Sequence, residues 1–115
     1  MFSESVKSRQ FIGTNKSQDI IAQTAWSTST TERSFTATED SWLVGLLGNK
    51  SAPGGAPETN GIVILINNII VAECSSQSAD GLIESICIPI KKGQSFSLKP
   101  LTGSWLAKLY YVDMN

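Results

Sequence analysis

Residues 61–73, GIVILINNIIVAE, constrain the fold more than any other stretch of this chain. They contain two short apolar runs, 62–66 and 69–72, that are rich in β-branched residues and are separated by Asn67 and Asn68. Each run is too short for a typical helix, and Asn tolerates a positive φ better than any residue except Gly. The stretch therefore predicts a tight β-hairpin. Only Glu73 in it offers acid-base chemistry, so the hairpin says little about activity.

Strand-like runs recur along the rest of the chain, separated by polar turns roughly every eight to twelve residues. Gly45 is expected at a bulge or at a point of close backbone approach, and Pro89 should place its strand at a sheet edge or end because proline donates no ladder hydrogen bond. No segment predicts a helix, so we expect an all-β protein of about seven or eight strands, a sandwich or a barrel. Besides the hairpin, the predicted strands of the domain cover 19–26, 33–38, 42–47, 82–90, 95–98 and 105–112; one further short strand, at 10–13, is considered within the N-terminal segment.

The length and composition predict a single domain with a polar, nearly neutral surface. A chain of 115 residues fits one domain, which we expect at 19–115, preceded by an arm or linker at 1–18. Charged residues make up 17% and the formal net charge is −1, so the clustered Lys and Arg that bind nucleic acid are absent. No apolar run approaches the roughly 20 residues that span a bilayer, and the N-terminus lacks the apolar core of a signal peptide. We expect no membrane insertion and synthesis in the cytoplasm.

The residue types argue against an enzyme, a cofactor and a metal site. The chain has no His, which removes the usual general base and the commonest metal ligand. Cys74 and Cys87 do not form a CxxC pair, and we interpret both as buried free thiols in strands rather than as a disulfide. The carboxylates, Asp19, Glu32, Glu39, Asp40, Glu58, Glu73, Asp80, Glu84 and Asp113, belong to no motif and mostly fall at predicted turns. A carbohydrate-degrading pair of carboxylates is the least favoured hypothesis.

Three predicted strands, 42–47, 62–66 and 105–112, are apolar on both faces. In a two-sheet sandwich only one face of each sheet covers the core, so a second apolar face predicts a further cover. A homo-oligomer supplies one, with an interface expected at Trp42, Leu65, Trp105 and Tyr111. The alternative is that scattered apolar surface residues need no cover, as in most monomers.

Binding is expected in the loops, because loops on a rigid scaffold usually carry binding sites. The loops at 49–60, 75–80 and 102–104 are rich in polar residues that suit a sugar or simple solubility. Trp26 is the tryptophan considered for stacking on a sugar ring, although burial is its alternative. The candidate ligand-binding residues are Asn49, Lys50, Glu58, Asn60, Gln77, Asp80, Thr102 and Trp26.

Several segments between residues 33 and 112 resemble compact jelly-roll knobs of bacteriophage tail and fibre proteins. The run FTATEDSWLVG at 35–45 looks like their strand-turn-strand entry, with Ser41 in place of the usual Gly. LINNIIV at 65–71 resembles their central hairpin, and IPIKKGQSF at 88–96 resembles a later one. The aromatic run at 105–112 matches their closing strand. The resemblance implies an antiparallel two-sheet jelly roll of the tumour-necrosis-factor-like or complement-globular-head-like type, usually assembled as a trimer.

The resemblance also implies a setting and a role. A knob of this family would sit in the virion, at a tail or fibre tip, and would adhere to a host-surface glycan or protein through its loops. In the alternative, the chain is a virion decoration or assembly module that docks on other virion proteins through the arm at 1–18. Both hypotheses describe a non-enzymatic protein without a cofactor.

Overall fold

The computed structural model describes residues 17–22, 25–50, 60–75 and 81–114, and for 17–19 the backbone alone. Within these ranges the chain forms eight strands and no helix, as the sequence predicts. The expected strand at 10–13 lies outside the described residues. The strands are β1 (Ser17–Ala22), β2 (Arg33–Thr36), β3 (Ser41–Lys50), β4 (Gly61–Ile66), β5 (Ile69–Ser75), β6 (Leu82–Ile90), β7 (Ser95–Pro100) and β8 (Ser104–Asp113).

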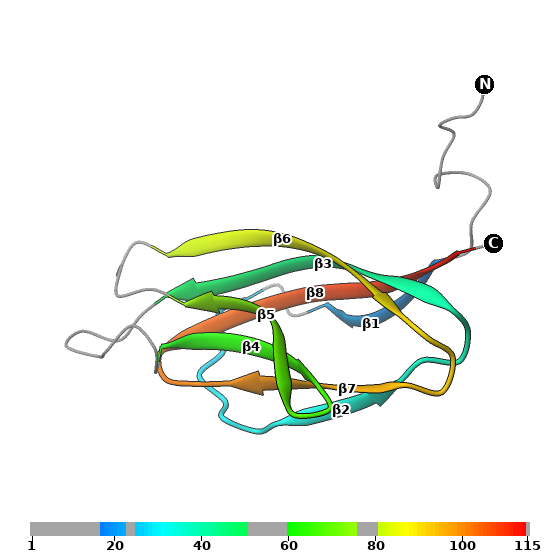
Figure 1. Cartoon of the computed structure of the whole chain (residues 1–115). Coiled ribbons are helices and arrows are strands. Elements are labelled where there is room, and N and C mark those ends of the chain that lie inside the picture. Colours follow the sequence, from blue (N-terminus) through cyan, green and yellow to red (C-terminus); the bar gives the residue numbers. More distant parts are fainter. Residues whose placement is uncertain (1–16, 23–24, 51–59, 76–80, 115) are drawn as a thin grey trace.

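The eight strands form two antiparallel four-stranded sheets stacked as a sandwich (Figure 1). One sheet has the order β1-β8-β3-β6 and the other β2-β7-β4-β5. The outer strands of the chain pair with each other (β1 with β8, β2 with β7), and the inner ones pair likewise (β3 with β6, β4 with β5). This nested winding is a jelly roll, so the predicted fold class is confirmed. β1 begins at Ser17, two residues before the domain start expected from the sequence.

The core consists of the inward side chains of both sheets, which alternate along each strand with outward ones. β3 and β8, the two central strands of the first sheet, contribute alternate residues that are almost completely buried. From the other sheet, Ile62 and Ile64 of the predicted hairpin are fully buried. Phe96 stacks on Phe35 at 5.2 Å between ring centroids and meets Tyr111 edge-on at 6.3 Å. The other core side chains are Ala37, Leu43, Leu47, Cys74, Ile90, Leu98, Trp105, Ala107 and Leu109.

The β4–β5 hairpin turns through Asn67 and Asn68, which have φ of 54° and 62°. Two consecutive positive φ values define a type I′ turn, the form whose twist matches that of a two-residue hairpin. The predicted hairpin is therefore confirmed. Its second strand, β5, is a sheet edge, as is β6, where Pro89 places it.

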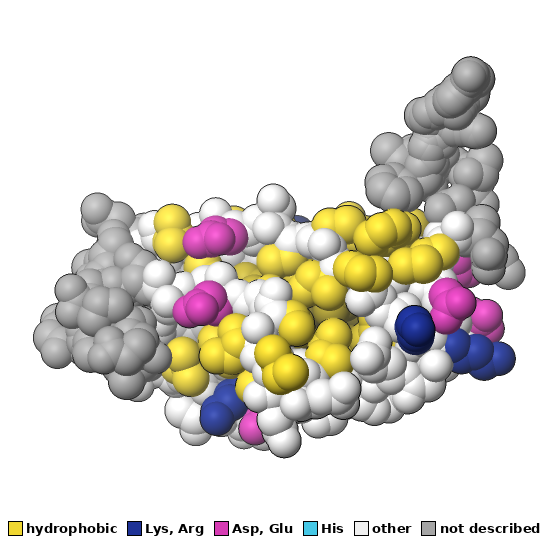
Figure 2. All heavy atoms as spheres, viewed as in Figure 1, with side chains coloured by type: hydrophobic (Ala, Val, Ile, Leu, Met, Phe, Trp, Pro, Cys, Tyr) yellow, Lys and Arg dark blue, Asp and Glu magenta, His cyan; other side chains and the backbone are white. Residues whose placement is uncertain are grey.

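Apolar side chains remain exposed along the side of the sandwich where the edges β5 and β6 lie. Ile69 is 65% exposed and Ile83 is 55% exposed. Figure 2 shows apolar side chains gathered on this side, between β6 and the β4–β5 hairpin. In the sheet that contains β5, the outer face of β2 and β7 is polar. Its hydroxyl groups form two pairs: Ser34 lies 3.1 Å from Ser97, and Thr36 lies 2.7 Å from Ser95.

Two expectations about the core are wrong. Trp105 was expected at a subunit interface or in the core, and Tyr111 at a subunit interface; both point inward from β8 and are only 5% and 7% exposed, so the interface is wrong for both. The reason is register: β8 buries alternate residues beginning with Trp105, so the residues between them face outward. Cys87 was expected in the core, but it lies outward on the edge strand β6 and is exposed, while Cys74 is fully buried.

Candidate functional site

Trp26 is an aromatic side chain that the fold places at the surface at the loop end of the sandwich. Its indole is 37% exposed. The neighbouring Ser27 exchanges two backbone hydrogen bonds of 2.8 Å with Trp105 at the start of β8. The Trp105 indole nitrogen also donates to the Ser29 carbonyl oxygen at 2.8 Å. A core tryptophan therefore anchors the segment that carries the exposed one.

Two glycines, one in β3 and one just before β6, form the floor beneath Trp26. A Cβ placed on Gly48 of β3 would come within 3.3 Å of the indole and 2.8 Å of the Leu106 side chain. A Cβ on Gly81, just before β6, would lie 3.5 Å from the indole. Because neither position carries a side chain, the ring can rest close to the backbone of the first sheet. At 37% exposure, part of the Trp26 side chain remains open to solvent.

Lys50 is the charged group beside this platform. Its Nζ lies 6.0 Å from the centroid of a Trp26 ring, within the range of a cation–π contact. Lys50 is the last residue of β3 and is exposed, so it can also donate hydrogen bonds outward. We call the surface formed by Trp26, Gly48, Lys50, Gly81 and Leu106 the Trp26 platform.

The fold brings several of the predicted binding residues to the same end of the sandwich. Lys50 and Trp26 belong to the Trp26 platform, and exposed Thr102 lies in the turn before β8. That turn is tied to the start of β4 by the Gly61 N–H, which donates to the Thr102 carbonyl oxygen at 2.9 Å. Glu58, Gln77 and Asp80 lie outside the described residues.

The expectation that Asn49 and Asn60 lie in an exposed loop is wrong, since both are fully buried. β3 continues to Lys50, beyond the predicted end at residue 47, and this places Asn49 in the inward register with Leu47. Asn60 is held by a bridge to Thr102 beside the start of β4. Neither side chain is available at the surface for a ligand.

Sequence reasoning missed the floor of the platform, namely Gly48, Gly81 and Leu106. The available signal was weak: Gly48 is a small residue at an outward position of β3, whose other outward residues are larger. Nothing in the sequence indicates that residues 26, 48 and 81 meet, because they belong to three separate segments.

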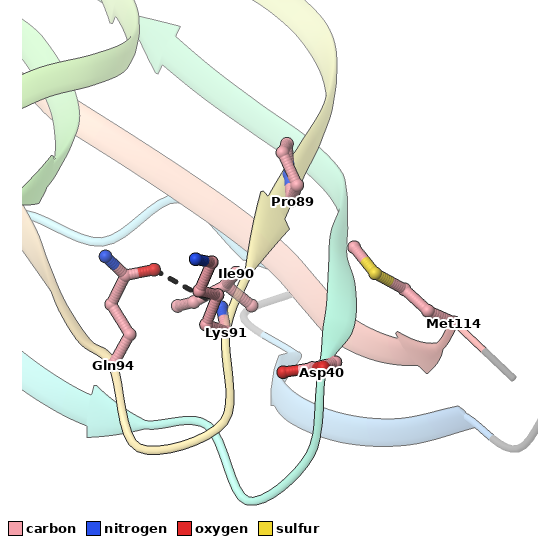
Figure 3. A pocket seen from close by; sticks show the side chains of 6 residues that line it. All are labelled: Asp40, Pro89, Ile90, Lys91, Gln94 and Met114. Carbon is pink, nitrogen blue, oxygen red and sulfur yellow. Dashed lines mark hydrogen bonds between the residues drawn. The ribbon is translucent and has the colours of Figure 1, made fainter.

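A pocket of about 380 Å³ lies at the opposite end, lined by Asp40, Pro89, Ile90, Lys91, Gln94 and Met114 (Figure 3). Its polar groups hold the turns together: the Lys92 N–H donates to Asp40 Oδ1 at 2.9 Å, and the Lys91 N–H donates to Gln94 Oε1 at 3.3 Å. The Met114 N–H donates to the Asp40 carbonyl oxygen at 3.1 Å. These groups serve the local backbone, and none of the predicted ligand residues lines the pocket.

The chemistry-bearing side chains do not assemble into a reactive centre within the part of the chain that the structure describes. No group of three or more His, Cys, Asp or Glu in these ranges could hold a metal ion. Burial, and after it the nearby Glu84 carboxylate, raises the pKa of the Cys74 thiol to about 11. Cys74 is therefore protonated at neutral pH, the opposite of what a nucleophile requires. The same ranges contain no helix long and apolar enough to cross a membrane.

No family model and no curated protein matches this chain. Among solved structures, the fold is similar to a family 35 carbohydrate-binding module from Clostridium thermocellum, with a TM-score of 0.42 and 13% identity over 84% of this chain and 88% of that chain. It is also similar to a family 35 carbohydrate-binding module from an environmental isolate, with a TM-score of 0.42 and 17% identity over 93% of this chain and 78% of that one. These likenesses concern the sandwich fold and assign no ligand to this chain.

Proposed function

We propose that this protein is a non-enzymatic binding module that adheres to a glycan through the Trp26 platform. The observation that carries the proposal is the exposed indole of Trp26, seated on Gly48 and Gly81 with Lys50 beside it. A flat, partly desolvated aromatic ring suits the apolar C–H face of a sugar ring, and a neighbouring ammonium group suits its oxygen atoms. The proposal rests on this surface and not on the distant similarity to the two carbohydrate-binding modules.

The surface charge favours a sugar over the other ligands that stack on aromatic rings. Nucleic-acid bases also stack on exposed aromatics, but their backbone requires a basic groove. The chain has nine Lys and Arg against ten Asp and Glu. A neutral glycan can bind without a basic groove.

A printed array of oligosaccharides, probed with the full chain, tests the proposal. We expect Trp26→Ala to lose binding to every oligosaccharide that the unmodified protein retains, and Trp26→Tyr to keep part of it because an aromatic face remains. Gly48→Ala should weaken binding with Trp26 still present, since the new methyl group displaces the indole. Ser34→Ala, on the outer face of the other sheet, is the matched control and should bind normally.

Because Trp26 lies against the backbone at Gly48 and Gly81, each variant is first checked for its folded state by urea denaturation. A folded Trp26→Ala variant that binds the array as well as the unmodified protein would refute the proposal. An unmodified protein that retains no oligosaccharide would refute it as well.

The resemblance of the sequence to phage knobs suggests the setting, and we propose that the module acts at a virion tail or fibre tip. In that setting Trp26→Ala particles should assemble normally and lose adsorption to the host. If the protein is instead a virion decoration module, the expected results are reversed. Trp26→Ala then leaves adsorption to the host intact, and removing residues 1–16, ahead of β1, abolishes incorporation of the protein into the virion.

A further inference from the structure

The outward face of the first sheet is apolar over three neighbouring strands. Pairing of β3 with β6 and with β8 aligns their outward residues in rungs across the sheet, each with a β3 residue in the middle. We name these residues the β3 face. Counted from the end of the sandwich that carries the turns 37–40 and 91–94, the rungs are Pro89–Trp42–Val112, Cys87–Val44–Tyr110, Ser85–Leu46–Lys108 and Ile83–Gly48–Leu106.

Ser85 and Lys108 are the polar side chains of the β3 face, and they stand in the same rung on either side of Leu46. The corresponding face of the other sheet is mixed: it carries the hydroxyl pairs of β2 and β7 and the rung Lys99–Val63–Glu73, together with Leu65 and the exposed Ile70. The β3 face is the more continuously apolar of the two, and a sheet face exposed to solvent normally carries more polar residues.

We propose that the β3 face is covered by a second copy of this chain, related by a twofold axis that runs along β3. Such an axis leaves each rung opposite itself and exchanges β6 with β8. Ser85 then faces Lys108 of the partner subunit, while Leu46 and Val44 meet their own counterparts. Ser85 and Lys108 are therefore matched with each other, Cys87 meets Tyr110 of the partner subunit, and the remaining pairings are apolar.

This matching distinguishes a second copy from an unrelated partner. A lone lysine on an apolar contact face is costly unless an oxygen atom accepts its hydrogen bonds. Under the twofold operation the Ser85 hydroxyl supplies that oxygen twice, once in each direction. An isologous interface requires this kind of self-complementarity.

The size of the face sets a small interface. Trp26 rests on Gly48 and so covers the last rung, which leaves three rungs for a partner. Three strands about 4.8 Å apart and about 20 Å long cover roughly 290 Å² in projection. Side-chain relief makes the accessible area larger, and the contact lies at or below the roughly 600 Å² that each partner contributes to the smaller specific interfaces.

Sedimentation equilibrium of the full chain at micromolar concentration measures the assembly. We expect a dimer for the unmodified protein and a monomer for Val44→Lys, which places two ammonium groups on the axis. Thr36→Lys, on the polar outer face of β2, is the matched control and should stay dimeric. A monomeric unmodified protein would overturn the proposal, and a trimer, which the sequence resemblance implies, would overturn its twofold form.

Cross-linking tests the axis without depending on a destabilising charge. In a Cys87→Ser background, Leu46→Cys places one exposed thiol on the axis, and Cys74 remains buried. A short bismaleimide should join two subunits through this residue. The same reagent should not join subunits of a Thr36→Cys variant in the same background. A dimer by mass that Leu46→Cys fails to cross-link would place the contact elsewhere.

Discussion

At the scale of single residues, Gly45 is the position where the backbone permits least change. It lies mid-strand in β3 with φ of 152°, and a Cβ there would collide with the carbonyl oxygen of Lys108 on the neighbouring strand. Because the obstacle is backbone in the middle of a sheet, it cannot move aside as a side chain would. A residue that looks like a simple gap in an apolar run is therefore required for β3 and β8 to pair.

We expect Gly45→Ala to lower the free energy of unfolding by about 3 kcal/mol or more, through strain and lost strand pairing. Gly93→Ala is the matched control, because Gly93 has φ of 84° and a Cβ added there would meet no atom within 4 Å. That change should cost only the conformational penalty of about 1–2 kcal/mol. Urea denaturation of both variants measures the difference, and equal losses would show that the contact with Lys108 is not the cause.

At the scale of elements, the strands are largely predictable from the sequence and their ends are not. Alternation of apolar and polar residues locates β2, β6 and β7, and the doubly apolar strands β3 and β8 prove to be the two central strands of the first sheet. The same signal cannot say which of two apolar sets faces inward, and this is why it puts Trp105 and Tyr111 at an interface. Asn49 looks like loop composition, and only the pairing of β3 with β6 carries it into the core.

The candidate site shows a further limit of the sequence at this scale. Trp26 and Lys50 can be named from residue type, since one offers a stacking surface and the other a charge at the end of a strand. Their proximity depends on Ser27 bonding to Trp105 across the chain and on two glycines meeting below the ring. Such an arrangement is a property of topology, which local patterning does not contain.

The β4–β5 hairpin gives a prediction for one element. Both turn residues are Asn at positive φ, and Gly reaches this conformation without the steric cost that a Cβ brings. We expect Asn68→Gly to raise the free energy of unfolding by about 0.5–1 kcal/mol. The control is Asn68→Ala, which should lower it by about 1 kcal/mol because Ala resists positive φ. Thermal unfolding followed by circular dichroism orders the three proteins, and a different order would contradict the type I′ assignment.

At the scale of the whole molecule, the winding of the jelly roll determines where the Trp26 platform and the β3 face lie on the sandwich. The turns at 37–40 and 91–94 lie with the C-terminus at one end of the sandwich, and the Trp26 platform lies at the other (Figure 1). The β3 face runs between these ends along the first sheet. A twofold axis parallel to β3 keeps the two loop ends on the same side, so both Trp26 platforms would point in one direction.

With this arrangement, the proposed dimer would be bivalent toward a glycan-coated surface. When two linked sites engage together, the apparent affinity exceeds that of one site by about 10²–10⁴-fold without a new contact. We therefore expect the unmodified protein to bind a densely coated oligosaccharide surface that much more tightly than it binds the same oligosaccharide free in solution. Val44→Lys should keep the solution affinity and lose the gain on the surface, whereas Trp26→Ala should lose both.

Surface plasmon resonance on dense and sparse coatings, paired with calorimetry of the free oligosaccharide, distinguishes the contribution of the β3 face to binding from that of the Trp26 platform. A Val44→Lys protein that still binds the dense coating as tightly as the unmodified protein would show that the β3 face contributes nothing to avidity. Weaker binding of the free oligosaccharide by Val44→Lys would instead show that the β3 face and the Trp26 platform are not independent. Independence is the expected result, because Val44 lies two rungs from Gly48, the rung on which Trp26 rests.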